Sequence, residues 1–263
     1  MSDTDTGIPS AVREEIDERL RSIAKQEGIR YLLAVESGSR AWGFPSPDSD
    51  FDVRFIYCRS RNEYLSLFPK PDVIERPIVD EIDLAGWDIR KALGLLLKHN
   101  AVLSEWIDSP IRYLPDDPVV ADLAGLCARN FNPRGYARHY ASLGQKSYAA
   151  VRSSDGGVPV KKLFYALRPA LAIRALRIDP ASRPAMNLQR LVAKCELPLA
   201  IEAQIAALVA QKAKTREAGV ADELPEITAL ILNELGRAEE VAERDDREAF
   251  AAEAEELFLR LVS

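Results

Sequence analysis

Two aspartates separated by a single residue, Asp50 and Asp52, are the strongest candidates for chemistry in this sequence. They lead into an apolar run, and residues two apart in a strand point to the same face. The two carboxylates would then lie side by side, where like charges are costly unless a cation lies between their oxygens. Carboxylate oxygens suit Mg²⁺ or Mn²⁺, and phosphate oxygens would complete the coordination shell. The spacing therefore predicts a metal site that also binds phosphate.

A third carboxylate is needed if two ions are to lie about 3.5–4 Å apart, the spacing used for in-line phosphoryl displacement. Asp83 is the best candidate, because it lies between apolar residues in a third apolar run. Its rivals are the nearby acids Asp80, Glu81 and Asp88. We expect Asp50, Asp52 and Asp83 to be metal ligands and catalytic residues, with the third acid favouring deprotonation of an attacking hydroxyl.

A turn containing Gly38 and Ser39 follows the first apolar run, and residues 40–49 connect it to Asp50. Glycine lets the backbone approach a ligand closely, so Gly38 would admit the β- and γ-phosphates of a triphosphate. The hydroxyl and amide of Ser39 would donate hydrogen bonds to these phosphates, and Arg40 would add a charge-assisted contact. These three residues are the expected phosphate cradle.

The alternating acids Asp48, Asp50 and Asp52 also resemble part of a calcium-binding loop. An EF-hand loop needs glycine at its sixth position and glutamate at its twelfth, where this sequence has Val53 and Arg59. A calcium loop is therefore excluded. A solvated acidic turn is the usual explanation of an isolated Asp-x-Asp, but apolar runs on both sides and the Gly-Ser turn favour a site.

Charge is distributed unevenly along the chain, although the net charge is only −6. Residues 1–128 contain 15 Lys and Arg against 23 Asp and Glu, residues 129–177 contain 10 against 1, and residues 178–263 contain 10 against 17. The net negative charge argues against indiscriminate binding of nucleic acid. An anionic ligand would bind the basic middle segment.

One helix face within the basic segment carries Lys161, Tyr165 and Arg168 at the spacing i, i+4 and i+7. Such a face is often merely solvated, yet a triphosphate or polynucleotide beside three acids needs a basic counterpart. We therefore expect these three residues to bind the nucleotide. Weaker members of the same group are Arg134, Arg138 and Lys146.

Apolar patterning predicts an α+β protein, in which a mixed sheet is followed by helices. The expected strands span 31–35, 52–57 and 79–84. The expected helices span 10–27, 88–99, 102–108, 120–130, 134–152, 159–178, 186–196, 199–216 and 225–262.

A cluster of prolines between 110 and 118 predicts a division of the chain into two domains. The first, 1–117, would be catalytic, and the second, 118–263, would be entirely helical. Within the helical domain, helices in 129–178 would bind substrate, and the charge-rich tail over 234–256 would be solvated.

The composition argues against several other classes of protein. No run of about 18 uncharged apolar residues is present and the N-terminal region is polar, so we expect no membrane span or signal peptide and a cytoplasmic location. Cys58, Cys127 and Cys195 are far apart and lack metal-ligand spacing, which predicts apolar fillers. His99 and His139 are isolated, which argues against histidine-based nucleophilic catalysis.

Several segments together carry a resemblance to a known group. Residues 37–43 (SGSRAWG), followed by 48–54 (DSDFDVR), look like the DNA polymerase β-type nucleotidyltransferase superfamily. The GSRAWG form is similar to the predicted nucleotidyltransferases associated with RNA ligases, called RlaP-like or YcgL-like. The resemblance covers roughly residues 30–178, and its further matches are 83–91 (DLAGWDIRK), Asn100, Glu105-Trp106 and 161–169 (KKLFYALRP).

The resemblance implies a polymerase-β-type catalytic domain with a mixed sheet, followed by helices, and an acidic triad of Asp50, Asp52 and Asp83. It also implies dependence on Mg²⁺ or Mn²⁺ and a nucleoside triphosphate (NTP) as substrate. The expected reaction moves a nucleoside monophosphate to a hydroxyl acceptor, here an RNA end, and releases pyrophosphate.

Two alternatives to an RNA-modifying enzyme remain. One is the transfer of AMP to a tyrosine or serine of a partner protein, as antitoxin-type relatives of the superfamily are thought to perform. The other is a nucleotide-binding regulator without turnover. The presence of all three candidate acids argues against the regulator, because a site that has lost its activity usually lacks one of them.

Overall fold

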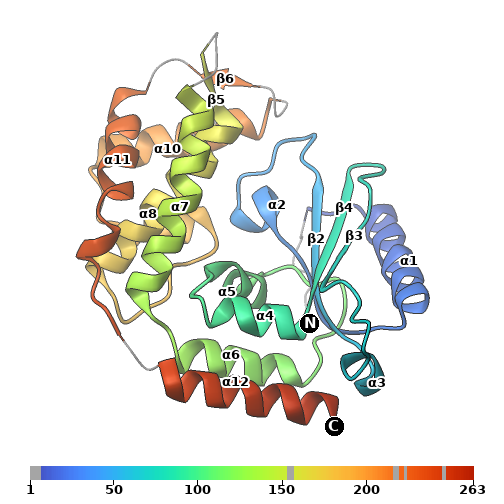
Figure 1. Ribbon diagram of the computed structural model, residues 1–263. Coiled ribbons are helices and arrows are strands. Elements are labelled where there is room, and N and C mark those ends of the chain that lie inside the picture. The colour runs from blue at the N-terminus through green and yellow to red at the C-terminus, as the bar shows by residue number, and fades with distance from the viewer. Residues whose placement is uncertain (1–6, 153–156, 216–218, 222–223, 245–246) are drawn as a thin grey trace.

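The computed structural model describes residues 7–152, 157–215, 219–221, 224–244 and 247–263. A small sheet with a long helix outside it forms one side of the molecule, and a group of helices forms the other (Figure 1). The mixed sheet and the many helices agree with the α+β class that the sequence pattern predicts.

Four strands form the sheet: β1 (Arg30–Glu36), β2 (Phe51–Cys58), β3 (Val73–Glu75) and β4 (Ile82–Asp88). Their order is β1-β2-β4-β3, in which β2 and β4 are parallel and the other neighbours are antiparallel. The apolar pattern predicts the first two strands correctly. It does not predict β3, because this edge strand is too short to show an alternation.

The third expected strand begins later than the apolar pattern indicates. Asp80 and Glu81 have φ values of 54° and 62°, which are left-handed conformations that a strand does not contain. An isolated bridge between Val79 and Ile82 closes this turn. Asp83 is consequently the second residue of β4, beside β2.

Helices cover both faces of the sheet. Side chains alternate between the faces along each strand, and both faces carry apolar side chains that are buried against helices. Val53 and Phe55 of β2 belong to an apolar cluster with α1 (Ser10–Glu27). Ile56 packs on the other face against α4 (Ile89–Leu96), α5 (Ala101–Asp108) and α6 (Val119–Arg129). Two short helices lie in the connections, namely α2 (Gly38–Trp42) and α3 (Arg61–Tyr64).

The helical group has its own core around α8, where Phe164, Leu167 and Leu171 are fully buried. Two very short strands, β5 (Val158–Pro159) and β6 (Val220–Ala221), pair at one end of this group. Its helices are α7 (Pro133–Arg152), α8 (Val160–Ile178), α9 (Leu188–Val192), α10 (Leu199–Lys212) and α11 (Pro225–Leu235).

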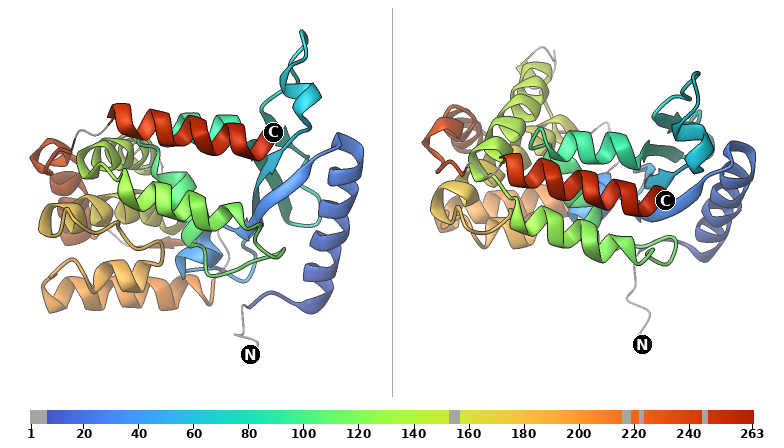
Figure 2. Two further views of the ribbon diagram at one scale, coloured as in Figure 1. Left: turned by 90° about the horizontal axis from the view of Figure 1, so that it is seen from below. Right: turned by 60° about the horizontal axis from the view of Figure 1, so that its bottom comes forward.

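The C-terminal segment differs from the single helix predicted over 225–262. After α11 come a short 3-10 turn, η1 (Ala238–Glu240), and a separate helix, α12 (Arg247–Val262). α12 lies beside α6 (Figure 2), and its Phe250 and Leu257 are buried in the cluster under the sheet. The prediction of a solvated tail is wrong for this face, because an apolar stripe is concealed among the charges of α12.

The division into two domains at residue 117 remains a prediction, although two helices that follow this residue pack on the sheet of the first domain. Both α6 and α12 follow that residue in the chain, yet they pack with α4 and α5 on the sheet. No helix among the described residues is long and apolar enough to cross a membrane. The three cysteines are buried and form no disulfide, as expected of apolar fillers.

A buried carboxylate on α11 provides a test of the helical core. Glu234 is 1% exposed and accepts hydrogen bonds from Arg174 at 3.0 Å and Arg177 at 3.1 Å, both on α8. Glu234→Ala leaves the two guanidinium groups without this acceptor, so we expect the free energy of unfolding to fall by about 2–4 kcal/mol in urea denaturation. The matched control is Glu239→Ala, which removes an exposed partner of Arg138 and should leave the midpoint nearly unchanged. Equal losses in both variants would contradict a structural role for Glu234.

Candidate active site

Asp52 and Asp83 lie directly opposite each other on the parallel strands β2 and β4. Their side chains share one guanidinium, because Arg54 Nη2 donates to Asp52 Oδ1 at 2.8 Å and to Asp83 Oδ2 at 2.6 Å. Arg54 is two residues after Asp52, so both side chains leave the same face of β2. The guanidinium therefore compensates the like charges of the two carboxylates.

Asp50 lies just before β2 rather than within it, and its charge still acts on Asp52. Burial is the main cause that raises the pKa of Asp52, and the charges of Asp83 and Asp50 raise this pKa further. The charges of Arg54 and Lys161 lower the same pKa. The structure thus brings the three acids into one electrostatic group, while their binding of a metal remains a prediction.

The rivals of Asp83 have other positions and partners. Asp88 caps α4 and accepts a hydrogen bond from the Tyr64 hydroxyl at 3.0 Å. Asp80 is exposed and pairs with Arg19 at 2.8 Å. The strand register thus places Asp83, the acid favoured by the sequence, beside the β2 aspartate.

The Gly-Ser turn forms the start of α2 and packs against Asp52. Gly38 has a φ of +60°, and a Cβ added to it would lie 1.8 Å from Asp52 Oδ2. The Ser37 amide also donates to the Asp52 carbonyl at 2.8 Å. Glycine is thus required by both the backbone conformation and the close approach. The expected cradle and the acid pair are parts of one site.

Three buried serines join the cradle to the loop that follows it. Ser39 Oγ donates to Ser49 Oγ at 3.1 Å, and the hydroxyls of Ser46 and Ser49 are 2.8 Å apart. Lys212, at the end of α10, donates to Ser46 Oγ at 3.2 Å although only 2% of this lysine is exposed. The sequence does not predict this role for Lys212, because no local spacing links α10 to the Gly-Ser turn.

Glu36, at the end of β1, is a second residue that the sequence analysis missed. It is fully buried, its Oε2 accepts from the Tyr113 hydroxyl at 2.6 Å, and its Oε1 accepts from the Asp52 amide at 3.2 Å. Burial raises the pKa of Glu36 to about 7, although the hydrogen bond from Tyr113 opposes this rise. A charged residue that ends a buried apolar strand was the available signal in the sequence.

Arg40 points toward the loop after the cradle. Its Nη2 donates to the Ser49 carbonyl at 2.9 Å, its guanidinium lies 4.3 Å from the centroid of the Phe51 ring, and its Nε is 3.6 Å from Glu36 Oε1. These contacts hold the loop that leads into β2. Contact between Arg40 and a phosphate remains a prediction.

The face of α8 that the helical spacing predicts does lie toward α2. The rings of Tyr165 and Trp42 are 5.1 Å apart, and the Arg168 guanidinium lies 4.7 Å from the centroid of the Trp42 ring. Lys161 lowers the pKa of the β2 aspartate. Arg168, however, is 4% exposed and pairs with Glu105 at 2.8 Å. It braces Trp42 and α5 in this structure, and nucleotide binding by all three residues stays a prediction.

Much of the remaining basic segment is neutralised by the acidic C-terminal part of the chain. Arg138 pairs with Glu239 at 2.7 Å, and Arg134 pairs with Glu243 at 2.8 Å. Other pairs of this kind are Arg129–Glu253, Arg174–Glu234 and Arg177–Glu234. The charge sum of this segment therefore overstates its free positive charge, because it counts arginines whose acidic partners are distant in sequence, and binding of an anionic ligand there stays a prediction.

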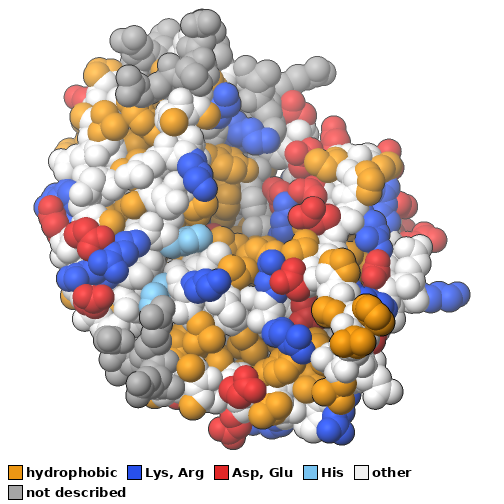
Figure 3. Space-filling model, viewed as in Figure 1, with side chains coloured by type: hydrophobic (Ala, Val, Ile, Leu, Met, Phe, Trp, Pro, Cys, Tyr) orange, Lys and Arg blue, Asp and Glu red, His pale blue; other side chains and the backbone are white. Residues whose placement is uncertain are grey.

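The donor chemistry of the acid pair fits a hard divalent cation, since carboxylate oxygens are the ligands that Mg²⁺ and Mn²⁺ prefer. On the face seen in Figure 3, acidic side chains gather on the sheet side of a hollow that separates the sheet from the helical group. Within the described ranges no three His, Cys, Asp or Glu side chains are already grouped as a metal cluster. A divalent ion would compete with Arg54 for Asp52 and Asp83.

A pair of glycine variants tests the close packing of the cradle. We expect Gly38→Ala to lower the free energy of unfolding by about 1–3 kcal/mol, because the new methyl group meets Asp52 and the backbone is left-handed. The matched control is Gly94→Ala on α4, where, among the described residues, no atom beyond the adjacent residues and the local helix backbone lies within 4 Å of the added Cβ. This control should gain about 0.5–1 kcal/mol in the same urea titration. Gains in both variants would contradict the close contact.

The buried carboxyl of Glu36 predicts a pH dependence in metal-free buffer. Its folded pKa of about 7 is above the ordinary 4.5, so the folded protein binds this proton more tightly than the unfolded chain does. The contribution of Glu36 to stability therefore falls as pH rises from about 4.5 to about 7. In urea titrations, the free energy of unfolding of Glu36→Gln should increase relative to that of the wild type across this pH window. Above the window, the difference between the two should stay constant. A difference that does not change with pH would contradict the raised pKa.

Comparison with known proteins identifies the family of this chain. Residues 12–260 match a family model described as RlaP, the RNA repair pathway DNA polymerase beta family. The uncharacterized protein YcgL of Bacillus subtilis (strain 168) is 34% identical over 256 residues, which are 95% of this chain and 96% of that protein.

The crystal structure of a nucleotidyltransferase-like protein from Exiguobacterium sibiricum 255-15 is 10% identical, with 94% of this chain and 79% of that chain covered. The TM-score of this match is 0.33. The match to the family model extends over nearly the whole length, and the chain belongs to the RlaP family of polymerase-β-type nucleotidyltransferases.

Proposed function

We propose that this protein transfers a nucleoside monophosphate from a nucleoside triphosphate to a hydroxyl at an RNA end, with Mg²⁺ or Mn²⁺, and releases pyrophosphate. The observation that supports this most is the pairing of Asp52 with Asp83 across β2 and β4, with the backbone of Gly38 against Asp52. The proposed metal ligands and the proposed phosphate-binding turn would thereby be adjacent, as in-line phosphoryl transfer requires.

The protein's own residues have distinct tasks in this proposal. Gly38 and Ser39 bind the β- and γ-phosphates through backbone amides, and the Ser39 hydroxyl would turn from Ser49 to donate to them. Asp50, Asp52 and Asp83 hold the metal, which when bound supplies charge neutralisation and favours an ionised attacking hydroxyl.

Other residues prepare the site for these tasks. Arg54 neutralises the acid pair in this structure, and it would have to release the two carboxylates for them to hold a metal ion. Lys212 and the buried serines fix the Ser39 hydroxyl from the helical side. Lys161 and Tyr165, on the face of α8 toward α2, bind the nucleotide as its basic and aromatic contacts.

An RNA end as the acceptor is supported by the description of the family as part of an RNA repair pathway. The charge distribution agrees with a selective acceptor site, because many of the basic residues are already paired with acids and do not form a general polyanion surface.

Asparagine variants of the acid pair test the proposed reaction. With labelled nucleoside triphosphate, Mg²⁺ or Mn²⁺ and an RNA oligonucleotide, we expect the wild type to label the RNA and release pyrophosphate. Asp52→Asn and Asp83→Asn should each reduce the rate by about a thousandfold or more, because bound metal supplies several kcal/mol of charge stabilisation. The matched control is Asp80→Asn, an exposed acid paired with Arg19, which should retain the wild-type rate.

Two outcomes would contradict the proposal. If none of the four nucleoside triphosphates labels RNA with either metal, the acceptor or the activity is wrong. If labelling occurs but Asp52→Asn and Asp83→Asn react as fast as Asp80→Asn, the acid pair is not the site of the reaction.

A further inference from the structure

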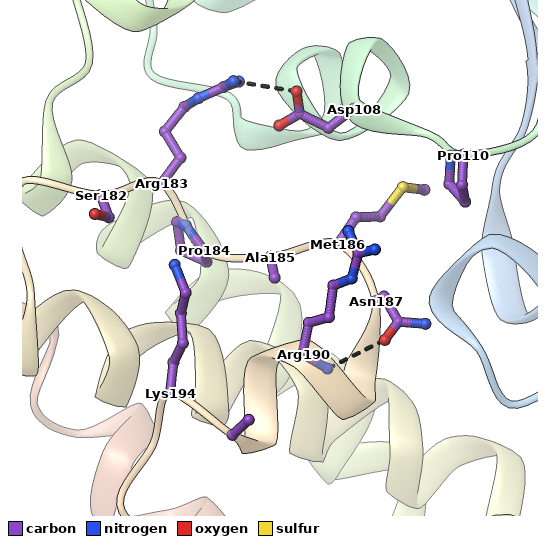
Figure 4. A pocket seen from close by; sticks show the side chains of 11 residues that line it. Asp108, Pro110, Ser182, Arg183, Pro184, Ala185, Met186, Asn187, Arg190 and Lys194 are labelled. Atoms are coloured by element: carbon purple, nitrogen blue, oxygen red, sulfur yellow. Dashed lines mark hydrogen bonds and ion pairs between the residues drawn. The ribbon is translucent and has the colours of Figure 1, made fainter.

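A pocket separate from the candidate active site lies between the end of α5 and the segment that runs from α8 into α9 (Figure 4). Its volume is about 970 Å³, which is large enough for more than one nucleotide unit. Its polar lining includes Asp108, Arg183, Asn187, Arg190 and Lys194. None of these residues belongs to the acid pair or the Gly-Ser turn.

The charge of this pocket is positive, and its cations are spread out. Among the described residues that line the pocket, three are cations, Arg183, Arg190 and Lys194, and one is a carboxylate, Asp108. Figure 4 shows their charged ends at three separate places rather than converging on one point. This spacing suits successive phosphates of a chain better than the contiguous phosphates of one triphosphate, which call for convergent donors.

Arg183 has a donor that the protein does not use. Its Nη2 pairs with Asp108 at 3.1 Å, whereas its Nη1 is buried and has no hydrogen-bond partner in the described part of the chain. A buried N–H without an acceptor is costly. The Arg183 side chain is 21% exposed, and a rotation of its guanidinium would bring this N–H to a phosphate oxygen in the pocket. Ala185 and Met186 add an apolar wall, against which a ribose or base can pack.

The pocket is connected to the cradle through its wall. Gln189 donates to the Gly43 carbonyl at 2.7 Å, directly after α2, and the Asn187 side chain lies against Gly43. Arg168, which stacks on Trp42, donates to the Met186 carbonyl at 3.0 Å. A ligand in the pocket would therefore rest on the same structure that positions the Gly-Ser turn.

We propose that this pocket binds the phosphate backbone of a single-stranded RNA acceptor, with Arg183, Arg190 and Lys194 each contacting a phosphate. The inference rests on the proposed function, since it places the body of the RNA whose end would be modified. It assigns the acceptor to a surface distinct from the acid pair, and it predicts RNA binding without metal or nucleoside triphosphate.

The test measures binding of a fluorescently labelled single-stranded RNA of about twelve nucleotides to the full chain, by polarisation, across a range of salt concentrations with a chelator present. Arg190→Gln/Lys194→Gln removes two exposed cations and leaves the Arg183–Asp108 pair intact, so the fold should be preserved. We expect about tenfold weaker binding near 0.1 M salt and a salt slope shallower by about 1.4, or 0.7 for each lost phosphate contact. Adding Arg183→Gln should weaken binding further.

The matched control is Arg21→Gln/Lys25→Gln, which removes two exposed cations from α1 on the opposite side of the molecule. It should bind RNA like the wild type. Equal affinity and slope in the control and pocket variants, or no RNA binding by the wild type, would overturn the pocket proposal. Pyrophosphate release with other acceptors, measured separately, shows whether the proposed transfer reaction fails as well.

A fluorescent nucleoside triphosphate titrated into the same variants gives the second reading. We expect equal affinity in the wild type and in Arg190→Gln/Lys194→Gln, because the cradle is elsewhere. Loss of triphosphate binding together with unchanged RNA binding would assign the pocket to the nucleotide instead and overturn the RNA proposal.

Discussion

Two carboxylates side by side on adjacent parallel strands repel each other, and the compensation of that charge governs the site. Asp52 and Asp83 face each other in register, and Arg54 provides the positive charge that allows both to be partly buried. Gly38 is tied to this arrangement, because Asp52 Oδ2 takes the space that a Cβ would fill. Glu36, at the end of β1, holds β2 at the same point, because its carboxylate accepts a hydrogen bond from the Asp52 amide. The residues at the turn and at the strand ends are thus arranged around the acid pair, by charge compensation at Arg54 and by close packing at Gly38.

The helical group completes the site from the other side. Lys212 reaches the buried serines of the loop after the cradle, and one face of α8 contacts Trp42 of α2. Many arginines of the basic middle segment instead hold the acidic C-terminal part in place, as Glu234 shows with its two partners on α8. Charge in this chain therefore serves two purposes. Pairs distant in sequence stabilise the helical group, and the cations of the pocket beside α9 are available to a phosphate-bearing ligand.

The sequence predicts the parts of the site whose signals are local. The strand around Asp52 and the Gly-Ser turn could be predicted, because an apolar pattern indicates a strand and a glycine indicates a turn within a few residues of sequence. The left-handed turn at Asp80 and Glu81 was not predicted, because positive φ is uncommon for any residue other than glycine. Lys212, Arg54 and the neutralised arginines could not be assigned either, because their partners are defined by tertiary packing. The prediction of a single helix over 225–262 was wrong for the same reason. Periodicity does not show where one helix ends and the next begins to pack against a different part of the protein.

The central claim is that the Asp52–Asp83 pair is a cation site occupied by Arg54 until a divalent ion arrives. The most direct measurement is a crystal structure with Mn²⁺ and a non-hydrolysable nucleoside triphosphate, in which anomalous scattering locates the metal. We expect Mn²⁺ on the carboxylates of Asp52 and Asp83, with phosphates at the Gly38–Ser39 turn and Arg54 displaced from both acids. Nucleotide and metal bound elsewhere, with Arg54 still bridging the two carboxylates, would contradict it.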